Sequence, residues 1–397
     1  MTKTRKVLLL VENVPAPADR RVWPEALVLR DNGYQVSVIS PKGTTNQRES
    51  YIYHEGIHIY RYRLPAIERK YIGHMVEYSV ALLMTFRLSV KVLFQRGFDV
   101  IHTANPPDIF FLIGLFYRLL GKKFVFDQHD LSPELFQVIF KKRAQWLYKL
   151  MRFFEKCSYR VANVVITTNE SQKRFAIERG RCQPERVFVV RNGPNLSQWK
   201  AVQPDLQLKG GRPFLLGYLG IMGVQDGVEY TLYALHELIY KRGRQDISLV
   251  LIGEGSSVNA LRNLAGALKI DEYTNFTGLV SRNEIPRYLA AIDIGLIPDP
   301  QNGVNEFSTM LKTMDYMAAR KPILAFDLAE TRFTAQEAAL YAKPNIIEDF
   351  ADKIEQLLAD EELRTRLGEF GRRRLEEELS WEHTSKNLVY AYQALFP

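Results

Sequence analysis

The sequence predicts an α/β protein built from two units, each with a parallel β-sheet covered by helices. The chain has 397 residues, of which 46% are hydrophobic, an ordinary globular composition with the length of two or three domains. Short apolar runs alternate with segments of helical periodicity, and this alternation stops over residues 192–213 and then starts again. No fixed-period repeat occurs, so two similar units are expected and not a solenoid.

The first half of the chain alternates strands with helices. Lys6 to Glu12 (KVLLLVE) contains a continuous apolar run, as expected for a strand buried on both faces, and Gly33 ends the helix that follows. Strands are expected at residues 6–12, 35–41, 51–53, 57–63, 99–103, 122–127, 163–168 and 186–191, and helices at 20–32, 71–95, 107–120, 133–160 and 170–179. Strands separated by helices of this length form a parallel sheet.

Residues 192–213 are the expected linker, because they hold three prolines, three glycines and little periodicity. After them the alternation of strands and helices resumes. Strands are expected at residues 214–219, 247–252, 273–276, 293–297, 322–326 and 338–341, and the closing helices at 346–359, 361–379 and 381–395. The second unit is therefore also expected to be an α/β unit.

The charge is distributed unevenly along the chain. Residues 1–203 carry 32 Lys and Arg against 17 Asp and Glu (+15), whereas residues 204–397 carry 21 against 28 (−7). The basic half favours an anionic partner, either a membrane surface, a phosphate-bearing substrate or nucleic acid. Nucleic acid is not expected, because no zinc-finger, RNP or basic-zipper pattern occurs and the second half is acidic. Two cysteines give neither a disulfide framework nor a zinc site, which points to the cytoplasm.

Three features of the second half suggest phosphate and sugar chemistry. Glycine-rich turns follow two expected strands, at 220–227 and 253–256, where backbone N–H groups and a helix dipole can approach a phosphate. Lys312 and Asp315 share one face of a helix, so a cation for a diphosphate lies near an acceptor for sugar hydroxyls. Taken separately, each feature has an ordinary explanation: steric need for glycine at a turn, and a surface ion pair.

The order of several motifs makes the sequence similar to a known family. In the second half these are residues 278–280 (GLV), Glu284, 288–290 (YLA), 293–298 (DIGLIP), 312–318 (KTMDYMA) and 321–323 (KPI). In the first half they are 19–22 (DRRV), Glu25, 33–36 (GYQV) and 127–130 (DQHD), followed by Asn192–Gly193 and the closing 381–392 segment. Together they resemble family 4 glycosyltransferases, retaining enzymes that use nucleotide-sugars, over nearly the whole chain.

The resemblance implies the GT-B fold, in which two Rossmann-like domains with parallel sheets face each other across a cleft. Residues 1–203, completed by the helix 381–397, would bind the acceptor, and residues 204–380 would bind the nucleotide-sugar. It further implies donor contacts by Gly220, Gly223, Gln225, Gly253, Glu254, Gly278, Leu279, Val280, Lys312 and Asp315. It implies acceptor contacts by Asp19, Arg20, Arg21, Asn105, Asp108 and Asp130. The catalytic group would comprise His129, Lys312 and Glu306, with His129 beside the transferred sugar.

The sequence departs from the family pattern in the donor half. Ile221 and Asp226–Gly227 stand where the family has an Arg and a Lys–Gly, and Phe307 stands at the first glutamate position, with Glu306 one residue earlier. No Asp-x-Asp occurs, so transfer without a metal or other cofactor is expected. Two alternatives stay open: a nucleotide-sugar-binding protein impaired in catalysis, and an epimerase or phosphorylase of the same fold.

Residues 141–160 suggest how the acceptor is reached. This segment carries seven basic residues and one acidic residue, with apolar side chains at helical spacing, which fits either an interfacial helix on anionic lipid or a core helix with a solvated basic side. The aromatic segment 71–95 could add a second lipid-facing surface, although core packing explains it as well. We therefore expect peripheral attachment to the inner face of the cell membrane and a lipid-linked acceptor in cell-surface polysaccharide synthesis. The oligomeric state is left open.

Overall fold

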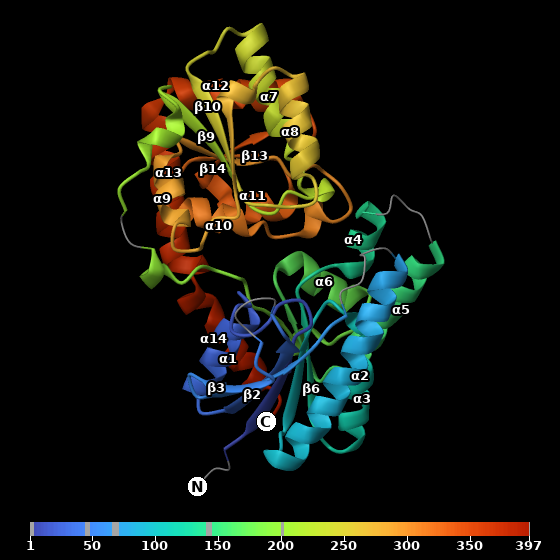
Figure 1. The fold of residues 1–397 in the computed structure, drawn as a ribbon. Coiled ribbons are helices and arrows are strands. Elements are labelled where there is room, and N and C mark those ends of the chain that lie inside the picture. The colour runs from blue at the N-terminus through green and yellow to red at the C-terminus, as the bar shows by residue number, and fades with distance from the viewer. Residues whose placement is uncertain (1–3, 44–47, 66–70, 140–144, 200–201, 397) are drawn as a thin grey trace. The chain divides into compact units, whose positions relative to one another are not determined.

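The structure, a computed structural model, describes residues 4–43, 48–65, 71–139, 145–199 and 202–396. Its internal contacts divide the chain into unit 1, residues 1–191 with 384–397, and unit 2, residues 192–383. The predicted fold class is confirmed, because each unit is a layered α/β body around a mainly parallel sheet (Figure 1). The sequence had predicted that the first domain ends at residue 203 and that the chain returns to this domain with the helix 381–397. That the units face each other across a cleft stays a prediction.

Within the described residues, the sheet of unit 1 has eight strands in the order β3-β4-β2-β1-β5-β6-β7-β8. Only the edge strand β3 is antiparallel to its neighbour. The strands are β1 (Lys6–Leu10), β2 (Gln35–Pro41), β3 (Tyr51–His54), β4 (Ile57–Tyr62), β5 (Val100–Ala104), β6 (Lys123–Gln128), β7 (Val164–Thr167) and β8 (Val187–Val189). Parallel neighbours require crossover connections, which are usually helical, and this matches the alternation in the sequence.

Helices cover both faces of this sheet. They are α1 (Val22–Asp31), α2 (Tyr71–Gln95), α3 (Phe111–Leu119), α4 (Ser132–Ile139), α5 (Gln145–Val161), α6 (Glu170–Glu178) and α14 (Trp381–Gln393). Helices α2, α3 and α5 lie on one face, and α1 and α14 on the other (Figure 1). Side chains alternate along a strand, so Phe124 and Phe126 of β6 pack in the core beneath α2 and α3. Asp127, the next residue of β6, therefore lies on the opposite face and contacts Arg21 at the start of α1. His102 of the neighbouring strand β5 lies on the same face as Asp127 and contacts Tyr392 of α14.

The sheet of unit 2 has six parallel strands among the described residues, in the order β11-β10-β9-β12-β13-β14. They are β9 (Phe214–Leu219), β10 (Ile247–Ile252), β11 (Thr274–Gly278), β12 (Ile294–Ile297), β13 (Ile323–Phe326) and β14 (Ala339–Ala342). The helices are α7 (Glu229–His236), α8 (Val258–Ala267), α9 (Ile285–Ala291), α10 (Leu311–Ala318), α11 (Ala329–Ala335), α12 (Ile347–Ala359) and α13 (Glu361–Arg374). The order changes direction at β9, so the carboxyl ends of β9, β10 and β12 meet where ligands bind in such sheets.

The predicted linker belongs structurally to unit 2. Leu196, Trp199 and Leu208 pack against the core of that unit. Gly193 approaches Leu379 so closely that a Cβ atom on it would lie 1.9 Å from the Leu379 carbonyl oxygen. Apolar side chains of this segment, whose composition predicted a linker, therefore pack against unit 2.

The helices predicted over residues 133–160 are described as α4 and α5. Residues 140–144 lie outside the described residues, and with them three cations of the expected membrane segment, Lys141, Lys142 and Arg143. In the part of the chain that is described, no helix combines the length and the apolar character needed to cross a bilayer.

Candidate functional site

Three glycines close the carboxyl ends of neighbouring strands in unit 2. Gly220 after β9, Gly253 after β10 and Gly278 at the end of β11 all have positive φ angles, of 148°, 135° and 70°. Their backbones are in direct contact, because Gly253 N–H donates to Gly278 O at 3.1 Å and Gly220 N–H donates to Ile252 O at 3.0 Å. A Cβ on Gly253 would lie 2.0 Å from Gly220 O. The predicted donor turns are thus brought together as one surface of bare backbone.

Two side chains hold the rest of the turn that follows β9, one from the turn itself and one from the loop before α10. Asp226 accepts a hydrogen bond from Gly223 N–H at 2.8 Å, and buried Asn305 donates to Gln225 O at 2.9 Å and to Pro300 O at 3.0 Å. Asn305 thereby fixes this turn to the loop that precedes α10. The other predicted donor residues are open to solvent: Glu254 and Leu279 are exposed and Val280 is half-buried.

Lys312 lies beside the Gly220 turn and is already paired. Its Nζ is 2.7 Å from Asp299 Oδ2, and both side chains are buried. The aliphatic end of Lys312 also approaches Gly220, since a Cβ there would be 3.5 Å from Cε. Burial raises the pKa of nearby Asp226 to about 6, although the charge of Lys312 opposes this. The cation predicted for a diphosphate is therefore positioned by Asp299.

Asp315 lies on α10, and Glu306 lies in the loop that precedes this helix. Asp315 is half-buried one turn after Lys312 on α10, so the two do share one face of the helix. Glu306 lies in the short 3-10 segment Asn305–Phe307, where its Oε2 accepts from Gln301 Nε2 at 3.3 Å. Both carboxylates thus belong to the same loop and helix as Lys312.

His129 in unit 1 is held by a buried carboxylate. It follows β6, and its Nε2 lies 2.5 Å from Asp127 Oδ2, while its side chain keeps 19% of its surface exposed. Its backbone N–H donates to Asn105 Oδ1 at 2.6 Å. Asp127 therefore orients the imidazole through Nε2, Asn105 anchors the backbone of His129, and part of the ring still reaches solvent. This arrangement is suited to positioning a charge at the surface of this unit.

Arg21 lies behind this pair and differs from its prediction as an acceptor contact. Its guanidinium donates to both oxygens of Asp127, at 2.6 and 3.1 Å, and to Val190 O at 2.8 Å, and the residue is 4% exposed. Burial alone would raise the pKa of Asp127, but the charges of Arg21 and His129 hold it well below its usual range. Arg21 thus stabilises the ionised carboxylate that orients His129, because a bidentate charged pair fixes geometry.

Glu25 and His102 complete the buried cluster. Burial, and then the charge of Asp127, raise the pKa of Glu25 well above its usual range, and burial lowers that of His102. His102 Nε2 lies 3.5 Å from Asp127 and 3.6 Å from Glu25, and its Nδ1 bonds Tyr392 OH at 2.8 Å. These three residues have the ligand types of a metal site. A cation does not fit there, because the Arg21 guanidinium already contacts both carboxylates.

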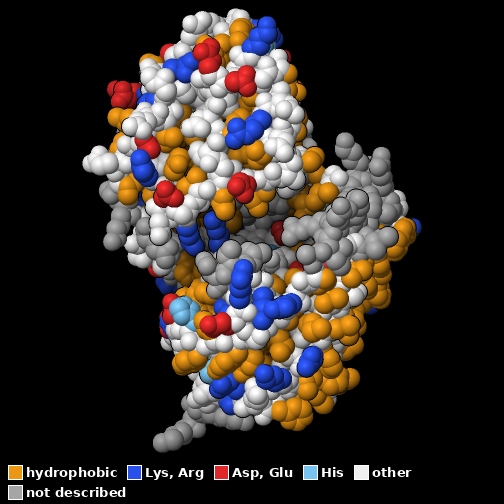
Figure 2. All heavy atoms as spheres, in the orientation of Figure 1, with side chains coloured by type: hydrophobic (Ala, Val, Ile, Leu, Met, Phe, Trp, Pro, Cys, Tyr) orange, Lys and Arg blue, Asp and Glu red, His pale blue; other side chains and the backbone are white. Residues whose placement is uncertain are grey.

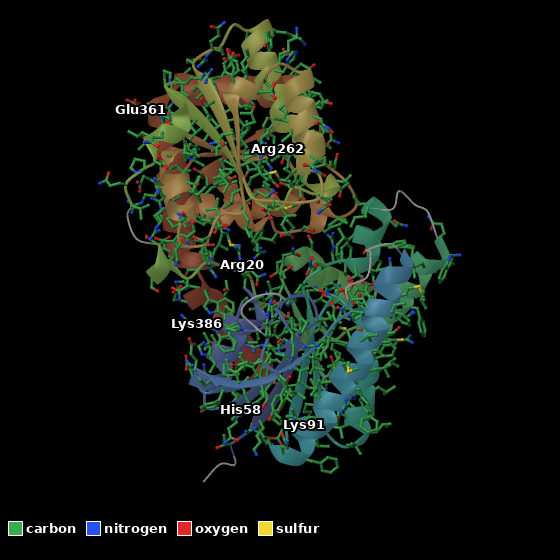
Figure 3. All side chains as sticks on the ribbon, in the orientation of Figure 1. Arg20, His58, Lys91, Arg262, Glu361 and Lys386 are labelled. Carbon is green, nitrogen blue, oxygen red and sulfur yellow. The ribbon has the colours of Figure 1, made fainter. Side chains whose placement is uncertain are left out.

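The remaining acceptor predictions divide by burial. Asn105 and Asp108 are buried, and Asn105 Nδ2 donates to Asp108 Oδ1 at 3.1 Å, so these two shape the loop beneath His129. Asp19 Oδ1 accepts from the N–H groups of Arg21 and Val22 and begins α1. Arg20 and Asp130 are exposed, and Figure 3 labels Arg20 at the surface of unit 1. Arg20 and Asp130 are thus the acceptor predictions with side chains free to reach a ligand from solvent.

Sequence reasoning missed Asp299, Asn305, Glu25, His102 and Tyr392 as parts of these clusters. One signal was available for Glu25, which follows Arg21 by one helical turn and matches an ion-pair spacing. For the others there was none, because a single polar residue on a strand or loop does not reveal its partner. Tyr392 reaches His102 across 290 residues of sequence.

Comparison with known proteins identifies related families. Residues 19–193 match the family Glycosyl transferase 4-like domain, and residues 213–360 match Glycosyl transferases group 1. An alpha-D-kanosaminyltransferase of Streptomyces kanamyceticus is 29% identical over 64% of this chain and 66% of its own length. The putative teichuronic acid biosynthesis glycosyltransferase TuaH of Bacillus subtilis is 26% identical over 37% of this chain and 36% of its own length. The matched region thus spans less than two thirds of these relatives.

Solved structures share the fold over nearly the whole chain. Sucrose-phosphate synthase from Thermosynechococcus elongatus has a TM-score of 0.80 at 19% identity, covering 99% of both chains. Anabaena HepE in complex with UDP-glucose has a TM-score of 0.72 at 13% identity, covering 98% of this chain and 99% of that one. Such distant likeness establishes the fold alone. That fold is GT-B. The two family matches show that the chain belongs to the glycosyltransferases, with a glycosyl transferase 4-like domain followed by a group 1 domain.

Proposed function

We propose that the chain is a retaining, metal-independent glycosyltransferase that moves a sugar from a nucleotide-sugar to a lipid-linked acceptor in cell-surface polysaccharide synthesis. One observation carries the proposal: the backbones of Gly220, Gly253 and Gly278 lie together beside Lys312, at the carboxyl ends of the strands of unit 2. Bare backbone and a fixed cation together suit a diphosphate. A likeness to a structure holding UDP-glucose makes UDP-sugars the first donors to test.

The leaving group is the nucleoside diphosphate. As the bond between the sugar anomeric carbon and the diphosphate oxygen breaks, its electron pair goes to that oxygen, where Lys312 stabilises the growing negative charge. Asp299 keeps the ammonium in place at 2.7 Å, so little reorganisation is needed in the transition state. The acceptor hydroxyl attacks from the same side, and its proton passes to a phosphate oxygen. The products are the glycoside and the nucleoside diphosphate.

His129 is assigned to the transferred sugar as a positioning and electrostatic group. The Asp127–Arg21 pair behind it fixes the ring, and its exposed edge is available to a ligand. No protein nucleophile is needed for this route. Asp315 is assigned to the nucleotide ribose and Glu306 to the sugar, from the loop and helix that also carry Lys312.

Apolar residues on unit 1 support membrane attachment. Trp146 and Phe153 of α5 are 60% and 58% exposed, and Lys149, Lys156 and Arg160 on the same helix are exposed too. Exposed apolar side chains continue on α3, at Leu112, Leu115, Phe116 and Leu119, and on Leu120 directly after it. Figure 2 shows hydrophobic side chains gathered over α2 and α3. Flotation with phosphatidylglycerol vesicles should show binding that weakens with salt, and no flotation at low salt would contradict the attachment.

The test of the enzyme measures nucleoside diphosphate released from a panel of UDP- and GDP-sugars, with and without isoprenoid-linked sugar acceptors. We expect release that requires acceptor, and a loss of about 100- to 1,000-fold in kcat for Lys312→Met. Lys312→Met/Asp299→Asn keeps the pocket neutral and guards against misfolding, and Lys241→Met, an exposed lysine of unit 2, is the control. Donor binding without release in any combination would instead support a binding protein that does not transfer.

A further inference from the structure

A cavity of about 570 Å³ opens in unit 1 between the sheet edge and α2, away from the His129 cluster. Its walls come from the end of β2, from β3 and β4, and from the second half of α2. The lining residues are Lys42, Ser50, Tyr51, Tyr60, Arg61, Tyr62, Arg63, Met84, Arg87, Leu88 and Lys91. Five of these eleven are cations and none is acidic, so the walls attract an anion.

Four of the cations have no acidic partner in the part of the chain that the structure describes. Lys42 is half-buried, and Arg63, Arg87 and Lys91 are exposed. Lys91, labelled in Figure 3, extends from α2 with Nζ 5.9 Å from the centre of the Tyr60 ring. Arg87 and Lys91 are one helical turn apart, so their like charges repel each other, and an anion bound between them would reduce that repulsion.

Hydrogen bonds hold several of the residues that line the cavity. Arg61 is buried and donates to Ala16 O at 2.7 and 3.2 Å, so backbone carbonyls hold it. Tyr60 OH accepts from Arg96 Nε at 3.0 Å, and Tyr51 pairs with Tyr60 across the strands. Burial lowers the pKa of Arg61, consistent with a guanidinium that lacks a strong counter-charge.

An apolar stripe runs along α2 next to the cavity. Met84, Arg87, Leu88 and Lys91 face the cavity at helical spacing, and Leu83 and Phe94 lie on the adjoining face of the same helix. Leu83 is 67% exposed and Phe94 is 84% exposed. A cationic pocket beside exposed hydrocarbon suits a molecule with an anionic head and an apolar chain.

We propose that this cavity binds the phosphate or diphosphate that joins a hydrocarbon chain to the acceptor sugar. The inference rests on the proposed function, since it names the part of the acceptor that unit 1 holds. Arg87, Lys91, Arg63 and Lys42 contact the phosphate oxygens, and the start of the hydrocarbon chain lies along Leu83 and Phe94. Anchoring the head group here keeps the sugar end of the acceptor near unit 1 while its chain remains at the membrane.

The test measures binding of farnesyl diphosphate to the full chain by isothermal titration calorimetry. Wild type should bind it at least ten times more tightly than farnesol, which lacks the diphosphate, and inorganic pyrophosphate should compete. Arg87→Gln/Lys91→Gln should weaken farnesyl diphosphate binding at least tenfold, whereas Arg366→Gln/Arg373→Gln, which removes two exposed cations from α13, should leave it unchanged. Equal binding by wild type and the Arg87/Lys91 variant, or equal binding of farnesol, would overturn the proposal.

Two further measurements distinguish a lipid head group from an isoprenoid diphosphate as the ligand, and test the cavity separately from the proposed enzyme function. If phosphatidylglycerol vesicles respond to Arg87→Gln/Lys91→Gln but farnesyl diphosphate does not bind, the cavity takes a lipid head group and the acceptor assignment is wrong. A thermal shift by UDP-sugar should be the same in wild type and in the Arg87/Lys91 variant, because that variant changes unit 1 alone. A variant that loses farnesyl diphosphate but keeps the UDP-sugar shift supports the inference. Absence of every UDP- or GDP-sugar shift in wild type would contradict the proposed function and not the cavity.

Discussion

Replacing Asp127 with Asn is the sharpest test of the buried cluster that holds His129. The change keeps the shape of the side chain but removes the charge that accepts two hydrogen bonds from Arg21 and one contact from His129. Both partners of the Arg21 pair are almost completely buried, at 5% and 0% side-chain exposure. Removing one member of a buried ion pair leaves an uncompensated charge, which costs about 3–5 kcal/mol.

The neighbouring carboxyl reduces this cost. Glu25 Oε1 lies 3.3 Å from Arg21, and the charge of Asp127 is one cause of its raised pKa. With Asp127 neutral, Glu25 ionises more readily and takes over as the counter-charge, so we expect the lower end, about 3 kcal/mol. At about 2–4 °C per kcal/mol for a unit of this size, the melting temperature should fall by roughly 6–12 °C. The double variant Glu25→Gln/Asp127→Asn also removes this second counter-charge, so its melting temperature should fall further than that of Asp127→Asn.

Differential scanning calorimetry of the full chain measures both variants. The control is Asp31→Asn, which removes the acceptor of an exposed pair with Arg30 in the same unit and should change stability by less than about 1 kcal/mol. Since the folded pKa of Asp127 is depressed, its contribution is present above the unfolded value near 3.9 and is lost as the pH falls towards the folded value. Asp127→Asn should therefore remove part of the acid sensitivity. If it melted within 1 °C of wild type, the cluster would not stabilise unit 1 as described.

Other substitutions test the remaining assignments. His129→Ala should lower kcat at least tenfold with an unchanged donor thermal shift, measured by nucleotide release, and normal turnover would refute its role at the sugar. Gly253→Ala places a Cβ 2.0 Å from Gly220 O, so it should abolish the UDP-sugar shift, whereas Gly243→Ala, where the space is open, should not. Burial raises the pKa of Asp226 to about 6, so the contribution of this carboxyl group to stability should fall as the pH rises from about 4 to 6. In urea unfolding, Asp226→Asn should therefore change how stability depends on pH over this range, and a pH dependence equal to that of wild type would contradict the assignment.

The order of elements was predictable from local chemistry. Continuous apolar runs such as 247–252 are typical of central strands that are buried on both faces, and β10 covers those residues. The glycines at 220, 253 and 278 were identifiable because each follows a strand and allows a backbone that other residues rarely adopt. The helix 71–95 and the last helix were predicted within a few residues.

Partners distant in the sequence were not predictable. Arg21 was predicted to contact an acceptor. The polar DRRV motif gives no sign that the guanidinium of Arg21 turns inward to Asp127, 106 residues later in the chain. Lys312 was predicted to contact a diphosphate, but nothing in the sequence indicated that Asp299 would pair with it and hold its ammonium group in place. Likewise, the cavity beside α2 joins residues of β2, β3, β4 and a helix, none of which formed a motif.

The sequence by itself determined the two α/β units and the positions of the glycine turns, because burial periodicity and backbone freedom are local properties of the chain. Only the tertiary structure decided which charges are paired, which are left open to a ligand, and where the linker packs. Those outcomes depend on distances between residues that are far apart in the chain. A sequence fixes such distances only through the packing of the whole unit, so they had to be read from the folded protein.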